Sequence, residues 1–256
     1  MNHLRKFELE NDYLQAKDSF VYPNVSYVVE KDILHYMKKS KYEFVDLGLP
    51  SGLKWAAWNV GATKPYESGL YFAWGEDKGY IVTRGELIEQ SQCAYDAIIT
   101  NADGSETTKT FEDVYSDYKY SENGEFTKYN ATDKLTTLAN EDDGCYLDET
   151  AIRMPTKAEC EELIANTTSA WTDNYNNSGI NGVTLTSKTN GNSIFVPAVG
   201  NVSGGAILSF GIVGFFWSSS LSSSVDKAYY FNFTSRSLGV SYSNRFVGMP
   251  LRAVRS

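Results

Sequence analysis

The residues from 215 to 256 alternate between apolar and small polar side chains. The clearest case is KAYYFNFTS (227–235), in which Phe231 and Phe233 occupy every second position. A period of two places successive side chains on opposite faces of a β-strand. Two further runs, SLGVSYS (237–243) and PLRAVRS (250–256), also have the character of strands. We therefore predict that these residues form antiparallel strands with one face in the core.

The segment from Ser218 to Gly248 has an unusual composition. It contains one Lys and no Glu, Gln, Met or Trp, whereas Ser, Tyr, Phe, Asn and Arg are frequent. Tyr and Phe offer a large contact area with few rotatable bonds, and Ser, Asn and Gly adapt their hydrogen bonds, as in antibody combining sites. This composition favours a surface that binds a partner. The alternative is the ordinary preference of β-strands for the same residue types.

The period of two also assigns faces. Tyr229, Phe231, Phe233 and Ser235 are expected on the core face, so the intervening residues are expected to face solvent. A shift of one residue would exchange the two sets. Together with polar residues expected in nearby loops, the candidate ligand-binding residues are Ser222, Ser223, Ser224, Asp226, Tyr230, Asn232, Thr234, Arg236, Ser241, Tyr242, Asn244 and Phe246.

Elsewhere the sequence predicts one clear helix and several short strands. The helix is expected over 153–172, with Thr156 and Glu159 as a capping box and with Cys160, Leu163 and Ile164 on its buried side. The fold class of the chain is therefore predicted as α+β, with antiparallel strands, few helices and long loops. Strands are expected within 43–49 and 53–60 around a Pro-Ser-Gly turn, and within 67–76, 182–188 and 190–200.

Two units are expected. Residues 1–40 are predicted to be a small attachment or oligomerisation module, made of a helix over 5–18 and a β-hairpin of 25–29 with 33–37. A segment of this length is too short for a core of its own. Residues 41–256 would form the main domain, with a variable region at about 215–250 and an acidic insertion of loops over 77–150.

Six blocks of residues occur in one order: FVDLGLPSGLKWAAWNVGA, GLYFAWGE, RMPTKAECEELI, GNSIFVPAVG, FWSSSL and LRAVRS. Over residues 42–256 the chain thereby resembles the major paralogous domain family of gut Bacteroidetes and their phages. The resemblance implies a C-type lectin-like fold, related to the fold of the formylglycine-generating enzyme.

The resemblance has a further implication for the end of the chain. Some members of this family are variable proteins of diversity-generating retroelements, which rewrite adenines in the C-terminal strands and loops. AAC and AAT codons changed at adenines never yield Lys, Glu, Gln, Met or Trp. The hypervariable reading fits the composition of 218–248, with Lys227 as the exception.

Enzyme chemistry is not indicated. The chain's two histidines, His3 and His35, lie outside every matching block, which argues against a histidine-based triad. The formylglycine-generating enzyme uses a pair of cysteines late in its domain, and no cysteine follows Cys160 in this chain. Together with Cys93 and Cys145, Cys160 is expected to be a reduced and mostly buried thiol. We therefore predict a protein that is not an enzyme.

No cofactor is expected. The acidic stretches 101–106 and 141–149 are the alternative location for a calcium ion, although they lack EF-hand spacing. The calcium-binding triplets of sugar-binding C-type lectins are missing as well. Four tryptophans in the matching blocks could stack on sugars, but core packing is the favoured interpretation for Trp55, Trp58, Trp74 and Trp217.

Charge and hydropathy limit the partners. The net charge of −9 argues against nucleic acid, and no apolar run approaches the roughly 18 residues of a membrane span. Residues 200–256 are mildly basic, which favours an anionic partner unless some of their arginines are structural. The first fifteen residues lack the apolar segment of a secretory signal, which favours synthesis in the cytoplasm and assembly into a virion.

We therefore expect a receptor-binding adhesin of a phage tail or appendage. Its partner would be a cell-surface protein or glycan of a host or neighbouring cell. Residues 1–40 would attach it to the virion or to sister subunits, for instance in a homotrimer. The alternative is a secreted or surface-anchored bacterial lectin that binds carbohydrate, and a remote alternative is an enzyme of the formylglycine-generating type.

Overall fold

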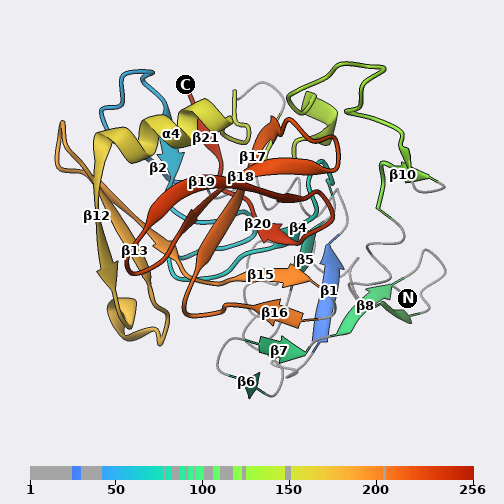
Figure 1. The fold of residues 1–256 in the computed structure, drawn as a ribbon. Coiled ribbons are helices and arrows are strands. Elements are labelled where there is room, and N and C mark those ends of the chain that lie inside the picture. The colour runs from blue at the N-terminus through green and yellow to red at the C-terminus, as the bar shows by residue number, and fades with distance from the viewer. Residues whose placement is uncertain are drawn as a thin grey trace.

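Strands dominate the computed structural model (Figure 1). Nearly all strand pairs are antiparallel, and the described part of the chain contains one α-helix, α4 (Lys157–Asn166). The predicted class is thus confirmed in its coarse form, a mostly β member of the α+β class. The structure describes residues 25–29, 42–77, 79–81, 87–89, 92–94, 96–100, 106–109, 118–122, 125–147, 151–203 and 206–256.

The first and last strands of residues 42–256 belong to one three-stranded sheet and flank the strand between them. Strand β2 (Phe44–Asp46) pairs with β3 (Lys54–Ala56), and β3 also pairs with β21 (Val254–Arg255). The predicted turn between β2 and β3 is present, since the N–H of Gly52 donates to the carbonyl of Leu49 at 2.9 Å. This sheet brings together two of the sequence blocks that lie farthest apart in the chain.

Helix α4 begins where the sequence predicts. The Thr156 hydroxyl accepts a hydrogen bond from the N–H of Glu159, and the Glu159 carboxylate accepts one from the N–H of Thr156. This capping box satisfies two backbone donors that the first helical turn leaves without partners. Cys160 and Leu163 are fully buried, as expected, whereas Ile164 is only partly buried against the same cluster.

The helix is shorter than predicted. It ends at Asn166, and Thr167–Thr172 form strand β12 instead of the last turns of a helix. The sequence TTSAWT is rich in β-branched and aromatic residues, which favour strands. Strand β12 is an outer strand of the β12–β13–β14 sheet, in which β13 is Gly182–Ser187 and β14 is Ser193–Pro197.

The sheet of β17 (Gly214–Leu221), β18 (Lys227–Phe233) and β19 (Leu238–Asn244) separates two hydrophobic clusters. Phe216 and Trp217 are neighbours in β17, and both have no exposed surface. Phe216 belongs to the cluster that contains Cys160 and Leu163 of α4, and α4 lies against all three strands (Figure 1). Trp217 belongs to a second cluster on the opposite face. Because adjacent residues of a strand point to opposite faces, this sheet is buried on both sides at β17.

The remaining described strands form three groups. The largest is a six-stranded sheet, in the order β20–β4–β5–β1–β8–β9, and the others have the orders β15–β16–β7–β6 and β10–β11. Their bounds are β1 Val25–Val29, β4 Tyr71–Phe72, β5 Gly79–Ile81, β6 Leu87–Glu89, β7 Gln92–Ala94, β8 Asp96–Thr100, β9 Glu106–Lys109, β10 Ser121–Glu122, β11 Glu125–Phe126, β15 Asn201–Ser203, β16 Ala206–Leu208 and β20 Met249–Pro250.

The strand predicted at 25–29 is present as β1, but its neighbours differ from the prediction. It pairs with β5 in antiparallel fashion and with β8 in parallel fashion, so both its edges join strands beyond residue 78. The expected helix over 5–18 and the expected hairpin strand 33–37 lie outside the described residues. The separation of residues 1–40 as a module of their own therefore stays a prediction.

Candidate binding surface

Strand β18 contains two of the candidate residues, Tyr230 and Asn232. Phe231 and Phe233 are fully buried, as the alternation predicts. The opposite face of the strand is also covered in part, because Ala228 is fully buried and Tyr230 packs against the second cluster. The Tyr230 ring lies 6.0 Å from that of Trp217. The expectation that Tyr230 faces solvent is therefore only partly right, since the second cluster lies on this face.

The strand is also shorter than the alternation suggested. Strand β18 ends at Phe233, and residues 234–237 form a turn. The Thr234 hydroxyl accepts hydrogen bonds of 3.1 Å from the N–H groups of both Arg236 and Ser237. Thr234 thus stabilises the turn, and Arg236 is exposed at its tip. Neither residue extends a strand face, because the short hydroxyl side chain competes for backbone donors.

The other candidates lie in β19 and in the loops beside it. Ser241, Tyr242 and Asn244 belong to β19, which covers most of the strand predicted at 237–243. Tyr242 is opposite Tyr229 and Ser241 is opposite Tyr230, so these candidates divide between the two faces of the sheet. None of the twelve candidates is buried: Ser223, Ser224, Arg236 and Tyr242 are exposed, and the partly exposed ones are Ser222, Asp226, Tyr230, Asn232, Thr234, Ser241, Asn244 and Phe246.

A pair of tyrosines with two lysines forms the most exposed aromatic feature of this sheet. The rings of Tyr229 and Tyr242 meet edge to face at 6.1 Å, and Tyr242 has 54% of its surface exposed. The Lys157 ammonium group lies 5.3 Å from the Tyr229 ring centroid, and that of Lys227 lies 5.6 Å from the Tyr242 ring centroid. Both distances suit cation–π attraction. Lys157 also pairs with Glu161 at 2.5 Å.

Sequence reasoning missed three members of this cluster. Tyr229 was assigned to the core, and Lys157 belongs to α4, about seventy residues before β18. A hydroxyl group at the end of an otherwise Phe-rich face was the one available signal at Tyr229, because a buried Tyr needs a hydrogen-bond partner. The neighbourhood of Lys157 and Lys227 depends on helix packing, which the sequence pattern does not specify.

Arg245 fixes the chain directly after β19. Its guanidinium group is fully buried and lies within 6 Å of five aromatic rings, the nearest being that of Phe126 at 4.5 Å. It donates hydrogen bonds to the carbonyls of Val225 and Lys128, both at 3.0 Å, and to the hydroxyl of Tyr118 at 3.1 Å. These bonds join the two ends of the candidate surface, at Val225 and Arg245, and tie Arg245 to Tyr118 and Lys128.

The buried carboxylate of Asp142 holds residues that lie around Arg245. Asp142 is 2% exposed and accepts hydrogen bonds from Lys119 at 3.0 Å, from Lys128 at 2.5 Å and from the Tyr129 hydroxyl at 2.5 Å. Burial raises the pKa of Asp142, but the hydrogen bonds from these residues lower it by more, so its pKa lies well below the usual range. The ionised carboxylate thus orders the segment whose carbonyls hold Arg245.

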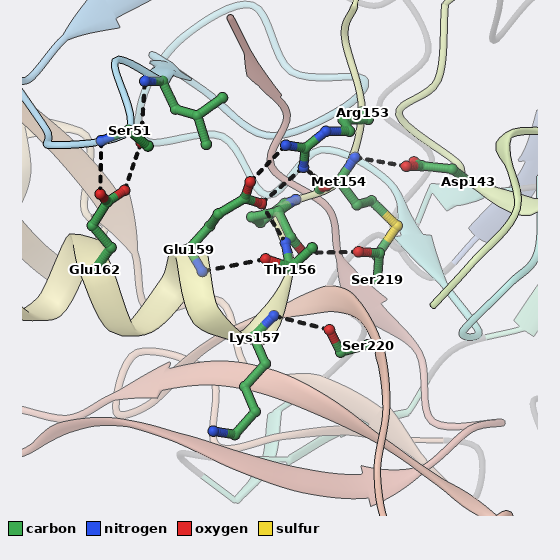
Figure 2. Close-up of polar contacts among 12 residues, drawn as sticks. Ser51, Asp143, Arg153, Met154, Thr156, Lys157, Glu159, Glu162, Ser219 and Ser220 are labelled. Carbon is green, nitrogen blue, oxygen red and sulfur yellow. Dashed lines mark hydrogen bonds and ion pairs between the residues drawn. The ribbon is translucent and has the colours of Figure 1, made fainter. Parts of the chain in front are cut away.

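The serines after Trp217 connect the sheet to the start of α4 (Figure 2). The Ser220 hydroxyl accepts a hydrogen bond of 3.0 Å from the N–H of Lys157, and the Ser219 hydroxyl donates one of 3.3 Å to the carbonyl of Pro155. Ser218 and Ser219 are buried. These serines are therefore part of the scaffold, although they lie within the segment predicted to be variable.

Figure 2 also shows how two neighbouring segments of the chain, at Arg153 and at Ser51, are bonded to the helix. Arg153 forms two hydrogen bonds with the Glu159 carboxylate, at 2.6 and 2.8 Å. Ser51 donates two to Glu162, through its N–H at 2.8 Å and its hydroxyl at 2.6 Å. Paired bonds of this kind fix orientation as well as distance. The helix is thus held at both its first and its second turn.

Two of the five basic residues after position 200 are structural. Arg252, like Arg245, has no exposed surface, and it donates hydrogen bonds of 3.0 Å to Asn59 and to the carbonyl of Phe195. Burial lowers the pKa of Arg252. The basic character of this segment is therefore a weaker argument for an anionic partner than the sequence suggested.

The tryptophans and cysteines whose side chains the structure describes occupy the core, apart from Trp58 and Trp171. Trp55, Trp74 and Trp217 have no exposed surface, as predicted, and Trp58 is partly exposed. Cys145 and Cys160 are buried thiols, and burial raises the pKa of the Cys160 thiol well above its usual range. A neutral thiol is a poor nucleophile.

Within the stretch 141–149 that was considered for calcium, the carboxylates of Asp142 and Asp143 already have partners, and Asp148 and Glu149 lie outside the described residues. The oxygens of Asp143 accept hydrogen bonds from the N–H groups of Cys145 at 2.7 Å and Met154 at 2.8 Å, and those of Asp142 bind lysines. Within the described residues, no group of three or more His, Cys, Asp or Glu side chains could hold a metal ion. No helix in the same residues is both long and apolar enough to cross a membrane.

Comparisons with models of protein families, with curated proteins and with solved structures gave no match to this chain. The resemblance noted from the sequence blocks therefore stays a prediction.

Proposed function

We propose that the chain is a non-enzymatic receptor-binding protein with a C-type lectin-like domain, which presents β18, β19 and their flanking loops to a partner on a cell surface. The observation that carries this proposal is the division of side chains in residues 222–246. All twelve candidates retain exposed surface, while the interleaved Phe231, Phe233 and Arg245 fill the interior. Such a division lets the outer residues vary without loss of the core.

The scaffold beneath this surface supports the proposal. The turn after β18 is stabilised by Thr234, the chain after β19 is held by Arg245, and the start of α4 is bonded to Ser220. A binding surface on rigid elements loses little conformational entropy when a ligand binds. The proposal extends to a hypervariable surface, as in retroelement-diversified relatives, and to attachment of the chain to a phage tail or appendage through residues 1–40.

The test is a binding screen of the purified full chain. The probes are a glycan array and whole cells of gut Bacteroidetes, each with and without chelator. The surface variant is Tyr242→Ala with Ser223→Ala, and the control is Ser169→Ala, an exposed position in β12. We expect binding that the surface variant reduces at least about tenfold and the control leaves unchanged. Turnover of a substrate, or binding that survives the surface variant, would contradict the proposal.

The same screen separates the candidate partners. Binding to arrayed glycans would favour the carbohydrate-binding lectin, for which the exposed Tyr242 ring offers a platform. Binding to cells that protease treatment abolishes would favour a protein receptor. A near-identical template copy of the encoding DNA beside a reverse-transcriptase gene would establish diversification.

A further inference from the structure

The two outer strands of the β17–β18–β19 sheet differ in the main-chain hydrogen bonds that their outer edges make. The edge of β17 is covered by neighbouring segments through main-chain hydrogen bonds. The N–H of Ser219 donates to the carbonyl of Pro155 at 2.8 Å, and that of Leu221 donates to the carbonyl of Thr136 at 2.8 Å. The N–H of Leu138 donates in return to the carbonyl of Ser219 at 2.9 Å. The fold thus closes this edge of the sheet.

Among the described strands, none lies along the outer edge of β19. In the part of the chain that the structure describes, Leu238–Asn244 pair with no strand other than β18, and one further main-chain hydrogen bond, from the N–H of Val247, reaches the carbonyl of Asn244. None of the seven is buried. In an antiparallel edge strand every second residue directs its N–H and C=O groups away from the sheet. Strand β19 therefore offers about three residues to an added strand.

The sequence of β19 lacks the usual protection of an edge strand. Natural edge strands are short, or carry Lys, Pro, an inward charge or a β-bulge, which prevent pairing with another chain. The run LGVSYSN contains no charged residue and no Pro, and its register with β18 is continuous over all seven residues. An edge without such features is suited to accept a strand.

We propose that a second copy of this chain occupies the edge, with the two β19 strands antiparallel about a two-fold axis through Ser241. In this register Ser241 lies opposite Ser241 of the partner subunit, and Val240 lies opposite Tyr242 of the partner subunit. An isologous contact of this kind uses the same surface on both copies.

Two observations favour a copy of the same chain over another strand. The register pairs a β-branched residue with an aromatic residue twice, which is a favourable cross-strand combination. In addition, β19 is uncharged although the chain carries a net charge of −9, so self-pairing places no like charges opposite each other. The resulting six-stranded sheet would set two candidate binding surfaces side by side, which increases avidity for a multivalent partner.

The first test is a disulfide scan of the full chain. Directly opposite residues of antiparallel strands have Cα atoms about 4.5–5.5 Å apart, within the range that a disulfide spans. We expect Ser241→Cys to form a covalent dimer under mild oxidation, with a 241–241 link in the peptide mass spectrum. Ser224→Cys, in an exposed loop, is the matched control and should give no more dimer than the wild type.

The second test uses charge. Ser241→Lys places two ammonium groups opposite each other, so the dissociation constant of the dimer, measured by sedimentation, should rise at least about tenfold. Ser169→Lys, in the exposed outer strand β12, should leave it unchanged, and a mixture of Ser241→Lys with Ser241→Glu should restore dimers. A monomeric wild type, or a dimer that only Ser169→Lys weakens, would overturn the proposal. Circular dichroism checks that each variant is folded. None of these readouts depends on ligand binding, so they are separate from the test of the proposed function.

Discussion

The Nε atom of Arg245 donates a hydrogen bond of 3.1 Å to the hydroxyl of Tyr118, which lies 127 residues earlier in the chain. The Tyr118 hydroxyl donates in turn to the carbonyl of Trp74 at 2.5 Å. Through these two bonds the end of β19 is joined to a segment that the sequence assigned to a loop-rich insertion. The candidate surface therefore depends on Tyr118 and Lys128 for its position.

Replacement of Arg245 should loosen this end of the surface. Lys cannot reproduce the fork that reaches Tyr118 and two carbonyls, so Arg245→Lys should lower the free energy of unfolding by about 3 kcal/mol. Urea denaturation followed by tryptophan fluorescence measures the change. Arg236→Lys, at the exposed turn, is the control and should change it by less than about 0.5 kcal/mol. Equal effects of the two substitutions would argue against the arrangement around Arg245.

Stability should fall in acid through Asp142. Its pKa is lower in the folded chain than in the unfolded chain, so the carboxylate stabilises the fold at neutral pH. This contribution should disappear progressively as the pH falls below about 4, the pKa of an unfolded Asp. Asp142→Asn should cost about 2 kcal/mol at pH 7 and nearly nothing at the acid end of the series. A cost that is independent of pH would show that the ionised carboxylate is not the cause.

Replacement of Gly214 by any residue with a Cβ atom should destabilise the fold. It lies opposite Phe233 in the β17–β18 ladder, and a Cβ atom there would overlap the Phe233 ring. Gly214→Ala should therefore destabilise the fold by about 2 kcal/mol, as measured by thermal unfolding. Combining it with Phe233→Leu, which shortens the side chain, should cost less than the sum of the two single changes. Additive costs would indicate that the two residues do not meet.

Tolerance to substitution should follow burial along residues 222–246. A library randomised at Ser223, Ser224 and Tyr242 should stay mostly folded, because surface changes usually alter stability by less than about 0.5 kcal/mol. Substitution of Phe231 or Phe233 by Ser should cost at least about 3 kcal/mol. Surface display sorted by protease resistance compares the libraries. A majority of unfolded members in the first library would contradict the proposed function.

Local signals in the sequence predicted local structure well. The capping box at Thr156, the turn at Gly52 and the alternation at Phe231 and Phe233 are all present, because each depends on residues a few positions apart. The helix was predicted too long, since β-branched residues after Asn166 form a strand whose partner, β13, begins ten residues after it ends.

Features that depend on distant contacts could not be predicted. The alternation in β18 indicated one core face, but the sheet has a cluster on each side, and no pattern within β18 records the second one. Lys157 reaches Tyr229 only because α4 packs on this sheet. The arginines of the C-terminal segment were counted as charges, whereas four of the five rings around Arg245 come from the acidic insertion, for which the sequence predicted only loops.

The pairing of β3 with β21 has a consequence for synthesis of the chain. Strand β3 meets Val254 and Arg255, about two hundred residues later, and the Arg153 N–H also bonds to the Val254 carbonyl. Contacts of such long sequence separation form slowly, and a ribosome releases these two residues well after β3 has left the exit tunnel. The sheet around β3 is therefore completed only after β21 has been synthesised. A chain truncated before residue 254 should not reach the native state.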